Sequence, residues 1–439
     1  MNVVFFAIVA IAFAVAAIRQ LGWDGLADDA PMAAMGNAMI ESASGAVELA
    51  IGLVGVMALF LGLMKVAEKG GLLSIIARLV RPMMIRLFPD VPADHPAMGA
   101  MILNMSANAL GLGNAATPFG IRAMQQLDTL NKHKGTATNA MILFLAINTS
   151  SVTLLPTGVI AIRAAAGSGD PAGIVSTTLF ATIISTTVAI TSVKLLQRFW
   201  TDPVVDADDL DAGETIDASQ IDALREEVEL ESDLLVDTGK GYAPWISYLS
   251  LGGLALMVPL TVVYGHDIAP WIIPGLMIAL LTFGAVKRVS IYEAFVEGAK
   301  DGFDVALRII PYLVAILVAV AMFRASGAMD MIITPLGAIT GLVALPPDAL
   351  PMALLRPLSG SGAYGIMASI INDPAIGPDS YTGYLVSTIQ GSTETTFYVL
   401  AVYFGAVGIR RIRYALIAAI LADVAGVVGA VIGCWYLYG

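Results

Sequence analysis

The chain has 439 residues, of which 57% are apolar and only 13% are charged. A soluble domain has roughly 25% charged residues, so this composition excludes a single water-soluble core and indicates a membrane protein. The net charge of −12 comes from one acidic stretch, 202–238, because the rest of the chain is nearly neutral. No basic face is left for phosphates, which argues against a nucleic-acid partner, and the single Cys434 excludes an intrachain disulfide.

Nine apolar stretches have about the length, near 20 residues, that a membrane-spanning helix needs. In chain order, spans are predicted at 2–18, 45–64, 138–161, 172–193, 243–263, 268–286, 308–324, 382–406 and 412–437. The first lacks the basic start and clear cleavage site of a signal peptide, so we expect an uncleaved helix. The predicted fold is an all-α polytopic bundle, whose halves 1–198 and 242–439 are joined by an acidic linker, 199–241.

Two further segments are apolar at both ends but broken in the middle. Residues 95–124 are interrupted by Asn, Gly and Pro, and residues 348–372 by the sequence PLSGSG. In lipid, the free backbone groups of a broken helix survive only inside protein or beside a watery cavity. We therefore predict two re-entrant helical hairpins, each preceded by an interfacial segment: the basic, amphipathic 66–90 and the Lys- and Arg-free 329–345.

The two halves align with each other, at an offset of 257 residues before the hairpins and 242 after them. Pro89 then matches Pro346, and INTSSVT at 147–153 lies over IQGSTET at 389–395. Five predicted crossings separate the start of one unit from the start of the other, so the units face opposite ways. An inverted repeat with broken helices in matching places is typical of secondary transporters with a binding site at the membrane midplane.

Orientation follows from Lys and Arg, which favour the cytoplasmic side of short loops. With the N-terminus inside and nine crossings, nineteen basic residues fall inside and four fall outside or in the outer half; these four are Arg19, Arg163, Arg324 and Arg356. We therefore expect a cytoplasmic N-terminus and a C-terminus on the outside.

Polar side chains gather at the predicted breaks and in the spans beside them. Glu394 is costly inside a span and should face the bundle interior; it could couple an ion or proton, contact a substrate, or pair with Arg356. Arg356 could in turn recognise an anion or serve only as that partner. Candidate substrate- or ion-binding residues are Asn104, Asn108, Asn114, Asn148, Thr149, Ser150, Ser151, Arg356, Ser359, Ser361, Gln390, Ser392, Thr393, Glu394 and Thr395. Hydroxyls and amides also pack between membrane helices without binding anything, so a structural role stays open for them.

Signals for catalysis are weak. GSGD at 167–170 matches a short signature of membrane aspartyl proteases, but it falls in a predicted loop and no Tyr-Asp pair precedes it in a span. The three His residues are far apart in sequence, and neither a zinc-protease motif nor a phosphate-binding loop is present. We predict no enzyme, no cofactor and no bound metal.

Longer motifs resemble a known family. NMSANALGLGNAATPFGIRAM at 104–124 resembles spore maturation protein A, whereas RPLSGSGAYG at 356–365 and the stretch from GPDSYTGYLV to RRIRYA at 377–415 resemble spore maturation protein B. The chain looks like a fusion of the two. Both belong to a group with Gate, or nucleoside-recognition, domains that includes concentrative nucleoside carriers. The resemblance implies a bacterial inner-membrane protein, linked in spore formers to dehydration of the spore core and without a settled substrate.

The function predicted is a transporter or permeation pathway for a small polar solute, alone or coupled to a cation or proton. The alternative is a non-transporting membrane scaffold or assembly factor in spore maturation, which would need neither Glu394 nor opposed hairpins. A homo-oligomer is left open. The acidic linker is either a solvated tether or a short amphipathic helix that docks on the basic segment 66–90.

The predicted topology can be checked by single-cysteine labelling after Cys434 is changed to Ser. Thr215→Cys, in the linker, should react only from the cytoplasm, and Ser168→Cys should react only from outside. Reaction of both positions from one side would contradict the inverted arrangement, because one crossing between the halves would be lost.

Overall fold

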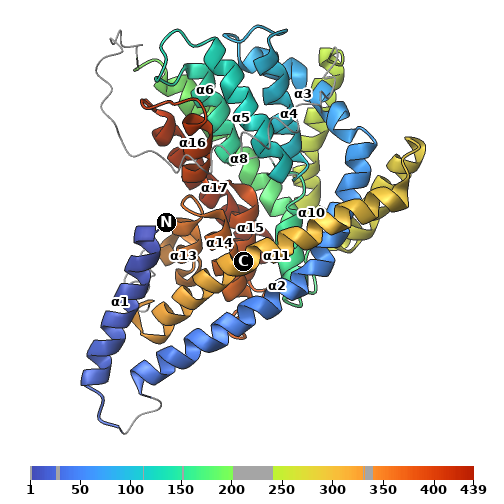
Figure 1. Cartoon of the computed structure of the whole chain (residues 1–439). Coiled ribbons are helices and arrows are strands. Elements are labelled where there is room, and N and C mark those ends of the chain that lie inside the picture. Colours follow the sequence, from blue (N-terminus) through green and yellow to red (C-terminus); the bar gives the residue numbers. More distant parts are fainter. Residues whose placement is uncertain are drawn as a thin grey trace.

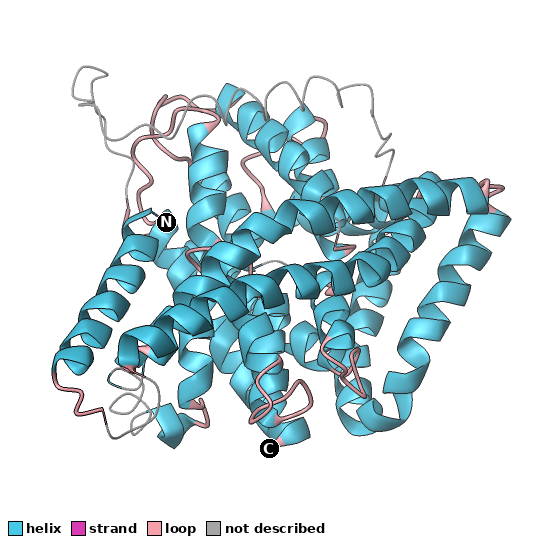
Figure 2. Cartoon of the chain, turned by 60° about the horizontal axis from the view of Figure 1, so that its bottom comes forward, coloured by secondary structure: helices cyan, strands magenta, loops and turns pink. Residues whose placement is uncertain are grey.

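The computed structural model describes residues 2–25, 30–111, 113–150, 153–200, 241–329, 331 and 340–439. These residues form helices and connecting loops, without a named strand (Figure 2). Three of the described helices are long and apolar enough to cross a membrane: α2 (Pro31–Lys69), α8 (Ile174–Leu196) and α17 (Ala415–Tyr438). The chain is therefore an all-α, multi-pass membrane protein, as its composition predicts. Nearly all of the acidic linker and most of the predicted interfacial segment 329–345 lie outside the described residues.

Figure 1 shows α2 and α11 side by side across the lower part of the molecule, with α1 next to them and the other helices packed above. The remaining helices are α1 (Asn2–Leu21), α3 (Leu72–Leu87), α4 (Pro96–Ala109), α5 (Gly113–Thr129), α6 (Asn139–Ser150), α7 (Thr157–Ala165), α10 (Pro244–Val286), α11 (Ile291–Ala325), α13 (Leu350–Leu355), α14 (Gly360–Ile371), α15 (Tyr381–Ser392) and α16 (Thr396–Gly405).

The helices of the second half repeat those of the first. The bounds of α6 and α15 differ by 242 residues at both ends, which is the offset found in the sequence. Gly135 and Gly377, also 242 apart, both have a positive φ, +78° and +76°. Thr138 and Ser380, at the same offset, cap the first turns of α6 and α15 with their side-chain oxygens. The repeat therefore extends from the helices to their caps and to the turns before them.

Corresponding helices of the two units run antiparallel. The Ser185 hydroxyl on α8 donates to the Ala422 carbonyl near the start of α17, at 2.8 Å. The carbonyl of Gly173, just before α8, accepts instead from the Tyr438 hydroxyl at the end of α17, at 2.9 Å. The order of contacts is reversed along the two helices, which is the geometry of an inverted repeat.

The crossing of α2 and α11 depends on glycine. A Cβ added at Gly302 would lie 2.7 Å from the backbone nitrogen of Ala58, and one at Gly298 would lie 2.4 Å from the Leu61 carbonyl oxygen. Membrane helices associate through close packing rather than through exclusion of water, so small residues are needed where backbones approach. These glycines allow the backbones of α2 and α11 to touch; we call α1, α2 and α11 together the lower arm.

Two predicted spans are not continuous helices. The span 138–161 divides into α6 and α7, and the span 382–406 divides into α15 and α16 at 393–395. Hydropathy averaged over a window detects the apolar character of both stretches but not a local interruption of helical backbone bonds. The first interruption ends at Pro156, which has no N–H group and directly precedes α7. The second is marked by Thr393 and Thr395, which have an extended conformation.

The predicted spans 243–263 and 268–286 form one helical element, α10, without a loop between them. The Tyr242 N–H donates to the Arg78 carbonyl at 3.2 Å, while the Phe283 ring lies against Gly70. A straight helix of 43 residues would hold its ends about 65 Å apart. Arg78 and Gly70 are only eight residues apart, so α10 bends back on itself and returns to the same end of the molecule.

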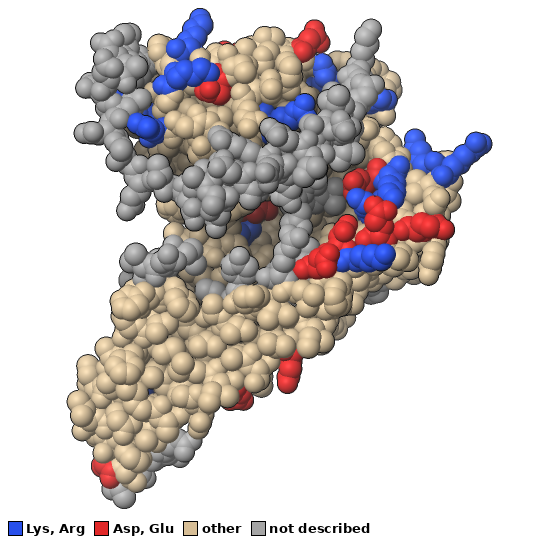
Figure 3. Space-filling model, in the orientation of Figure 1, with Lys and Arg blue, Asp and Glu red and all other residues tan. Residues whose placement is uncertain are grey.

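Charge is distributed unevenly over the surface. Lys and Arg gather at the upper end of the molecule and at the far end of α2 and α11, whereas the lower arm is almost free of them in this view (Figure 3). At the far end, Lys69 pairs with Glu297 at 2.5 Å. The surface over the lower part of α1, α2 and α11 is mostly apolar, with a few acidic residues, and suits contact with lipid (Figure 3).

The α2–α11 crossing can be tested by alanine substitution in two helices. Gly302→Ala should lower the free energy of unfolding by about 1–3 kcal/mol, because the new methyl group overpacks the backbone of Ala58. Gly275→Ala is the control: nothing lies within 4 Å of the added Cβ, and a helical Gly→Ala change normally stabilises by roughly 0.5–1 kcal/mol. Thermal unfolding in detergent would measure both, and an equal response at the two sites would contradict the close crossing.

Candidate functional site

A cavity of about 160 Å³ lies where four interruptions of the helices meet. Its lining comes from the turn between α4 and α5, the segment between α6 and α7, the break between α13 and α14, and the break between α15 and α16. Both units therefore contribute equivalent parts to one space. Of the residues predicted as a binding site, Asn108, Arg356, Gln390, Thr393 and Glu394 line it.

Arg356 connects the breaks of the second unit. Its Nη1 donates to the Thr395 hydroxyl at 3.0 Å, and its Nη2 donates to the Thr393 carbonyl. The same guanidinium pairs with Glu394 at 3.7 Å. The Arg356 side chain is 6% exposed, whereas that of Glu394 is 44% exposed. Arg356 is thus held by backbone and hydroxyl oxygens, and Glu394 is the member of the pair that a solute in the cavity can reach.

Backbone groups at the breaks are bonded both between the units and within the second unit. The Glu394 N–H donates to the Thr149 carbonyl at the end of α6, at 2.8 Å. The Phe397 N–H at the start of α16 donates to the Pro357 carbonyl at 3.1 Å. These bonds are made by groups that a continuous helix would use internally, and they keep unpaired backbone away from lipid.

The side-chain amides of the predicted asparagines form a network of hydrogen bonds that reaches the second unit. The Asn108 amide donates to Asn148 Oδ1 at 2.9 Å, and the Tyr403 hydroxyl donates to the same oxygen at 3.4 Å. The Asn104 amide donates to the Tyr403 hydroxyl at 3.1 Å. The Asn148 amide in turn donates to the Phe144 carbonyl within α6. Asn108 carries this network to the wall of the cavity, so the network orients that wall.

Gln390 stands out among the lining residues because it is 3% exposed and neither polar atom of its amide makes a hydrogen bond of normal geometry, with the Tyr364 hydroxyl as its polar neighbour. A buried amide without partners costs about 1–3 kcal/mol. Since Gln390 lines the cavity, a donor or acceptor entering that space would satisfy it.

Several other residues predicted as a binding site do not line this cavity. Ser359 caps α14 by accepting from the Gly362 N–H at 3.0 Å, and Ser361 lies in the first turn of α14 without lining the cavity. Hydroxyls that bond to carbonyls of their own helix belong to Thr149, Ser150 and Ser392. Ser151 and the side chain of Asn114 lie outside the described residues.

A buried carboxylate beside the breaks, Asp423, was not predicted. It is the only charged residue of α17 and is 5% exposed. Its Oδ2 accepts from the Thr396 hydroxyl at 2.7 Å, and its Oδ1 has no hydrogen-bond partner. The signal that could have found it is the presence of a lone carboxylate in the middle of a predicted span.

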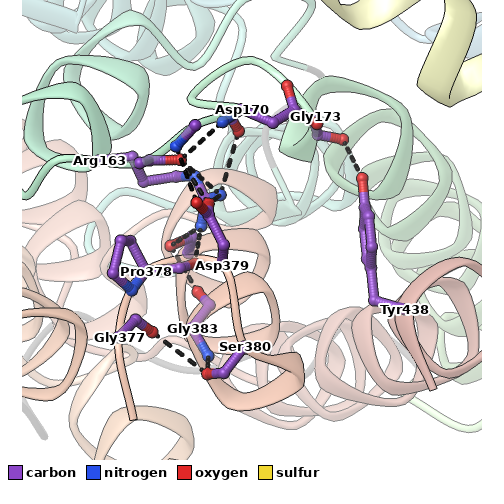
Figure 4. A network of polar contacts seen from close by, with 12 residues as sticks. Arg163, Asp170, Gly173, Gly377, Pro378, Asp379, Ser380, Gly383 and Tyr438 are labelled. Carbon is purple, nitrogen blue, oxygen red and sulfur yellow. Dashed lines mark hydrogen bonds and ion pairs between the residues drawn. The ribbon is translucent and has the colours of Figure 1, made fainter. Parts of the chain in front are cut away.

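A second polar cluster joins the units away from the cavity (Figure 4). The fully buried Arg163 donates to the Pro378 carbonyl at 2.6 Å, to Asp379 Oδ1 at 3.0 Å and to the Asp170 carbonyl at 3.1 Å. Its guanidinium also lies 4.2 Å from the centre of the Tyr384 ring. The predicted loop that holds GSGD thus contacts the loop between α14 and α15; we call this contact the Arg163 clasp.

An equivalent contact, the Arg413 clasp, joins the corresponding loops of the repeat, although its arginine is not at the position that corresponds to Arg163. The loop between α16 and α17 meets the loop between α5 and α6: the Arg410 N–H donates to the Gly135 carbonyl at 2.9 Å. Arg413 Nη1 donates to the Ala137 carbonyl and to Asn139 Oδ1, both at 3.1 Å. Each unit therefore holds the other through one arginine-containing loop contact.

A family model described as "Nucleoside recognition" matches residues 50–166 and 306–410. These two stretches cover both units and together make up half of the chain. The chain therefore belongs to the Gate family.

Two Bacillus subtilis (strain 168) proteins are relatives of this chain. Spore maturation protein B is 47% identical over 167 residues, which are 38% of this chain and 93% of that protein. Spore maturation protein A is 50% identical over 149 residues, which are 34% of this chain and 76% of that protein. Each match covers about a third of the chain, consistent with a fusion of an A-like and a B-like part.

Two solved structures align over nearly the whole chain at low identity. A structure of CNTnw in an inward-facing, substrate-bound state has 13% identity and a TM-score of 0.44, over 98% of this chain and 91% of that one. The YdaH transporter of Alcanivorax borkumensis has 16% identity and a TM-score of 0.39, over 99% of this chain and 97% of that one.

The Arg163 clasp gives a prediction about stability. Asp379→Ala should lower the free energy of unfolding by about 1.5–3 kcal/mol, because a fully buried guanidinium loses its charged acceptor. Asp373→Ala is the matched control in the same loop. It pairs with Arg324, whose side chain is 41% exposed, and an exposed pair contributes roughly 0–1 kcal/mol. Equal effects of the two substitutions on thermal unfolding would show that the clasp does not stabilise the fold.

Proposed function

We propose that the chain is a membrane transporter or permeation pathway for a small polar solute, which binds in the cavity between the two units. The observation that carries the proposal is the unpartnered amide of Gln390 in a cavity built from equivalent breaks of both units. Pockets for drug-sized ligands have volumes of about 300–1,000 Å³. A cavity of about 160 Å³ suits a smaller solute.

The family description names nucleoside recognition, but it does not determine the solute of this chain. Substrate choice depends on the residues of the site and not on the fold. Here the site offers an amide at Gln390, a second amide at Asn108 and the partly exposed carboxylate of Glu394. A solute with hydrogen-bond donors, and with positive charge or a bound proton near Glu394, matches this lining.

Alternating exposure of the cavity would follow from the inverted arrangement. The pairs α4–α5 and α13–α14 act in this proposal as re-entrant hairpins, one entering from each side of a bacterial inner membrane, with the N-terminus in the cytoplasm. Glu394 is the coupling residue: its carboxylate holds a cation or proton, and its affinity changes when its contact with Arg356 changes. In this proposal the chain transports its solute and does not transform it.

The alternative is a membrane scaffold in spore maturation. The names of the two relatives, spore maturation proteins A and B, favour it, and the clasps between the units would serve a rigid scaffold as well. In a scaffold, however, a buried amide without a partner would lower stability without serving a function. A scaffold would also show no change in melting temperature when solutes are added.

The first test is a substitution at the cavity. Glu394→Gln should leave the unfolding free energy within about 1 kcal/mol of the unchanged protein, because its 3.7 Å contact with Arg356 is too long for a hydrogen bond and Arg356 keeps its bonds to Thr393 and Thr395. Uptake of a solute into proteoliposomes should instead fall, or lose its dependence on pH or on a cation. Unchanged stability together with unchanged uptake would remove Glu394 from the mechanism.

The matched variant is Arg356→Gln, which removes the bonds to Thr393 and Thr395 as well as the ion pair. It should lower stability more than Glu394→Gln does. The solute itself can be sought by thermal-shift screening with nucleosides, dicarboxylates and metal ions. A hit should raise the melting temperature of the unchanged protein, and the shift should disappear in Gln390→Leu. Absence of any ligand response, with normal function of Gln390→Leu in spore maturation, would favour the scaffold.

A further inference from the structure

The carboxyl of Asp423 has an environment that favours its neutral form. It lies in the apolar helix α17, 5% exposed, with one hydrogen bond from Thr396 and none to Oδ1. An ionised carboxylate that has lost its water needs paired charge or several donors. Thr396 alone supplies one donor, whereas a proton on the free Oδ1 removes the charge.

The charge available near Asp423 is already engaged. Arg356 is the cation whose field reaches Asp423, and it pairs with Glu394 and donates to Thr393 and Thr395. One guanidinium thus lies close to two carboxyl groups, since it donates to Thr395 and Asp423 accepts from the next residue, Thr396. With Glu394 ionised, the group of three is neutral only when Asp423 carries a proton.

The described residues of the helices packed on α17 add no other charge close to Asp423. On α8 the neighbouring groups are hydroxyls such as Ser185, which bonds to the Ala422 carbonyl, and Lys194 lies at the far end of that helix, bonded to Leu87. The other titratable side chains on α15, α16 and α17 are uncharged near neutral pH: Tyr381, Tyr384, Tyr398, Tyr403, Cys434, Tyr436 and Tyr438.

A metal cation is a poor occupant for this place. Among the described residues, no group of three or more His, Cys, Asp or Glu side chains could hold a metal ion. Asp423 has one hydroxyl beside it and a guanidinium nearby, whereas hard cations take six or more oxygen ligands. The proton is the cation that a single carboxyl oxygen can hold.

Only the side chain of Thr393 separates the region of Asp423 from the cavity. Thr393 lines the cavity and its methyl group lies against Gly426, about one turn along α17 from Asp423. A Cβ at Gly426 would lie 2.6 Å from that methyl carbon. The carboxyl and the cavity are thus separated by the Thr393–Thr395 break, whose oxygens accept hydrogen bonds from Arg356.

We propose that Asp423 is a proton-binding site: it holds a proton on Oδ1 while Arg356 is paired with Glu394, and releases it when Glu394 is taken from Arg356. On release the O–H bond of the carboxyl breaks and the proton passes to water in the cavity. The freed guanidinium then compensates the new carboxylate. This inference deepens the proposed transport function, since a solute that binds Glu394 would expel one proton from Asp423.

The test uses infrared spectroscopy of the purified full chain without solute, so it does not depend on transport. The difference spectrum between the unchanged protein and Asp423→Asn should contain the carbonyl stretch of one protonated carboxylic acid at neutral pH. Asp301→Asn, on the exposed face of α11, is the control and should give no such band. Absence of the band from about pH 5 to about pH 9, where buried carboxyls titrate, would overturn the proposal.

Coupling is tested by titrating that band in Glu394→Gln. With Arg356 released, Asp423 should lose its proton at a pH lower by about one unit or more, a tenfold fall in proton affinity. An unshifted titration would overturn the coupling, and a midpoint that moves with sodium concentration would identify a metal site instead. If Asp423→Asn does not fold, Asp423→Glu should move the band without removing it. A normal band with no transport would leave the proton site standing and reject the transport function alone.

Discussion

The structure depends on one constraint: the backbone N–H and C=O groups at the helix breaks must find partners inside the protein. Each unpaired group would cost several kcal/mol in hydrocarbon. The chain meets this constraint by letting the breaks of one unit serve the other, as in the bond from the Glu394 N–H to the Thr149 carbonyl. Breaks whose backbone groups bond to each other have to lie together. The space that they enclose is lined by the polar groups that these bonds do not use. The cavity is therefore a result of how the backbone is satisfied.

The two clasps act on the same arrangement from its ends. The Arg163 clasp and the Arg413 clasp involve loops at corresponding places of the repeat, and each joins one unit to the other. A fully buried guanidinium such as Arg163 tolerates little displacement, because its acceptors are backbone carbonyls and one carboxylate. By contrast, the contact of Arg356 with Glu394 is long and partly exposed. Any relative movement of the units is easier to accommodate at the cavity than at either clasp.

Much of the fold could be predicted because its signals are local. Gly, Asn and Pro mark the breaks at 110–112 and 356–359, and apolar length marks α8 and α17. The break at 393–395 was not predicted, since an average over an apolar window conceals three extended residues. The contacts of Arg163 with residues more than 200 positions away have no local pattern at all. The contact of Glu394 with Arg356 could be predicted, as one of several open roles for both, because a charge inside an apolar stretch needs a partner. Asp423 could not be singled out in the same way, because a hydropathy average over a long apolar stretch conceals one carboxylate.

The interlocking of the units has a consequence for how the polypeptide can be divided. Backbone bonds, the amide network and both clasps all run between the first and second halves. Proteolytic nicking between α8 and α10 would cut a covalent tether but none of these bonds. The products would be two fragments that remain associated through purification and that separate only on denaturation. If the fragments were expressed separately, the polar groups of each that bond to the other would have no partner and would face lipid. We therefore expect the two to be stable as an obligate heterodimer and to be degraded when alone.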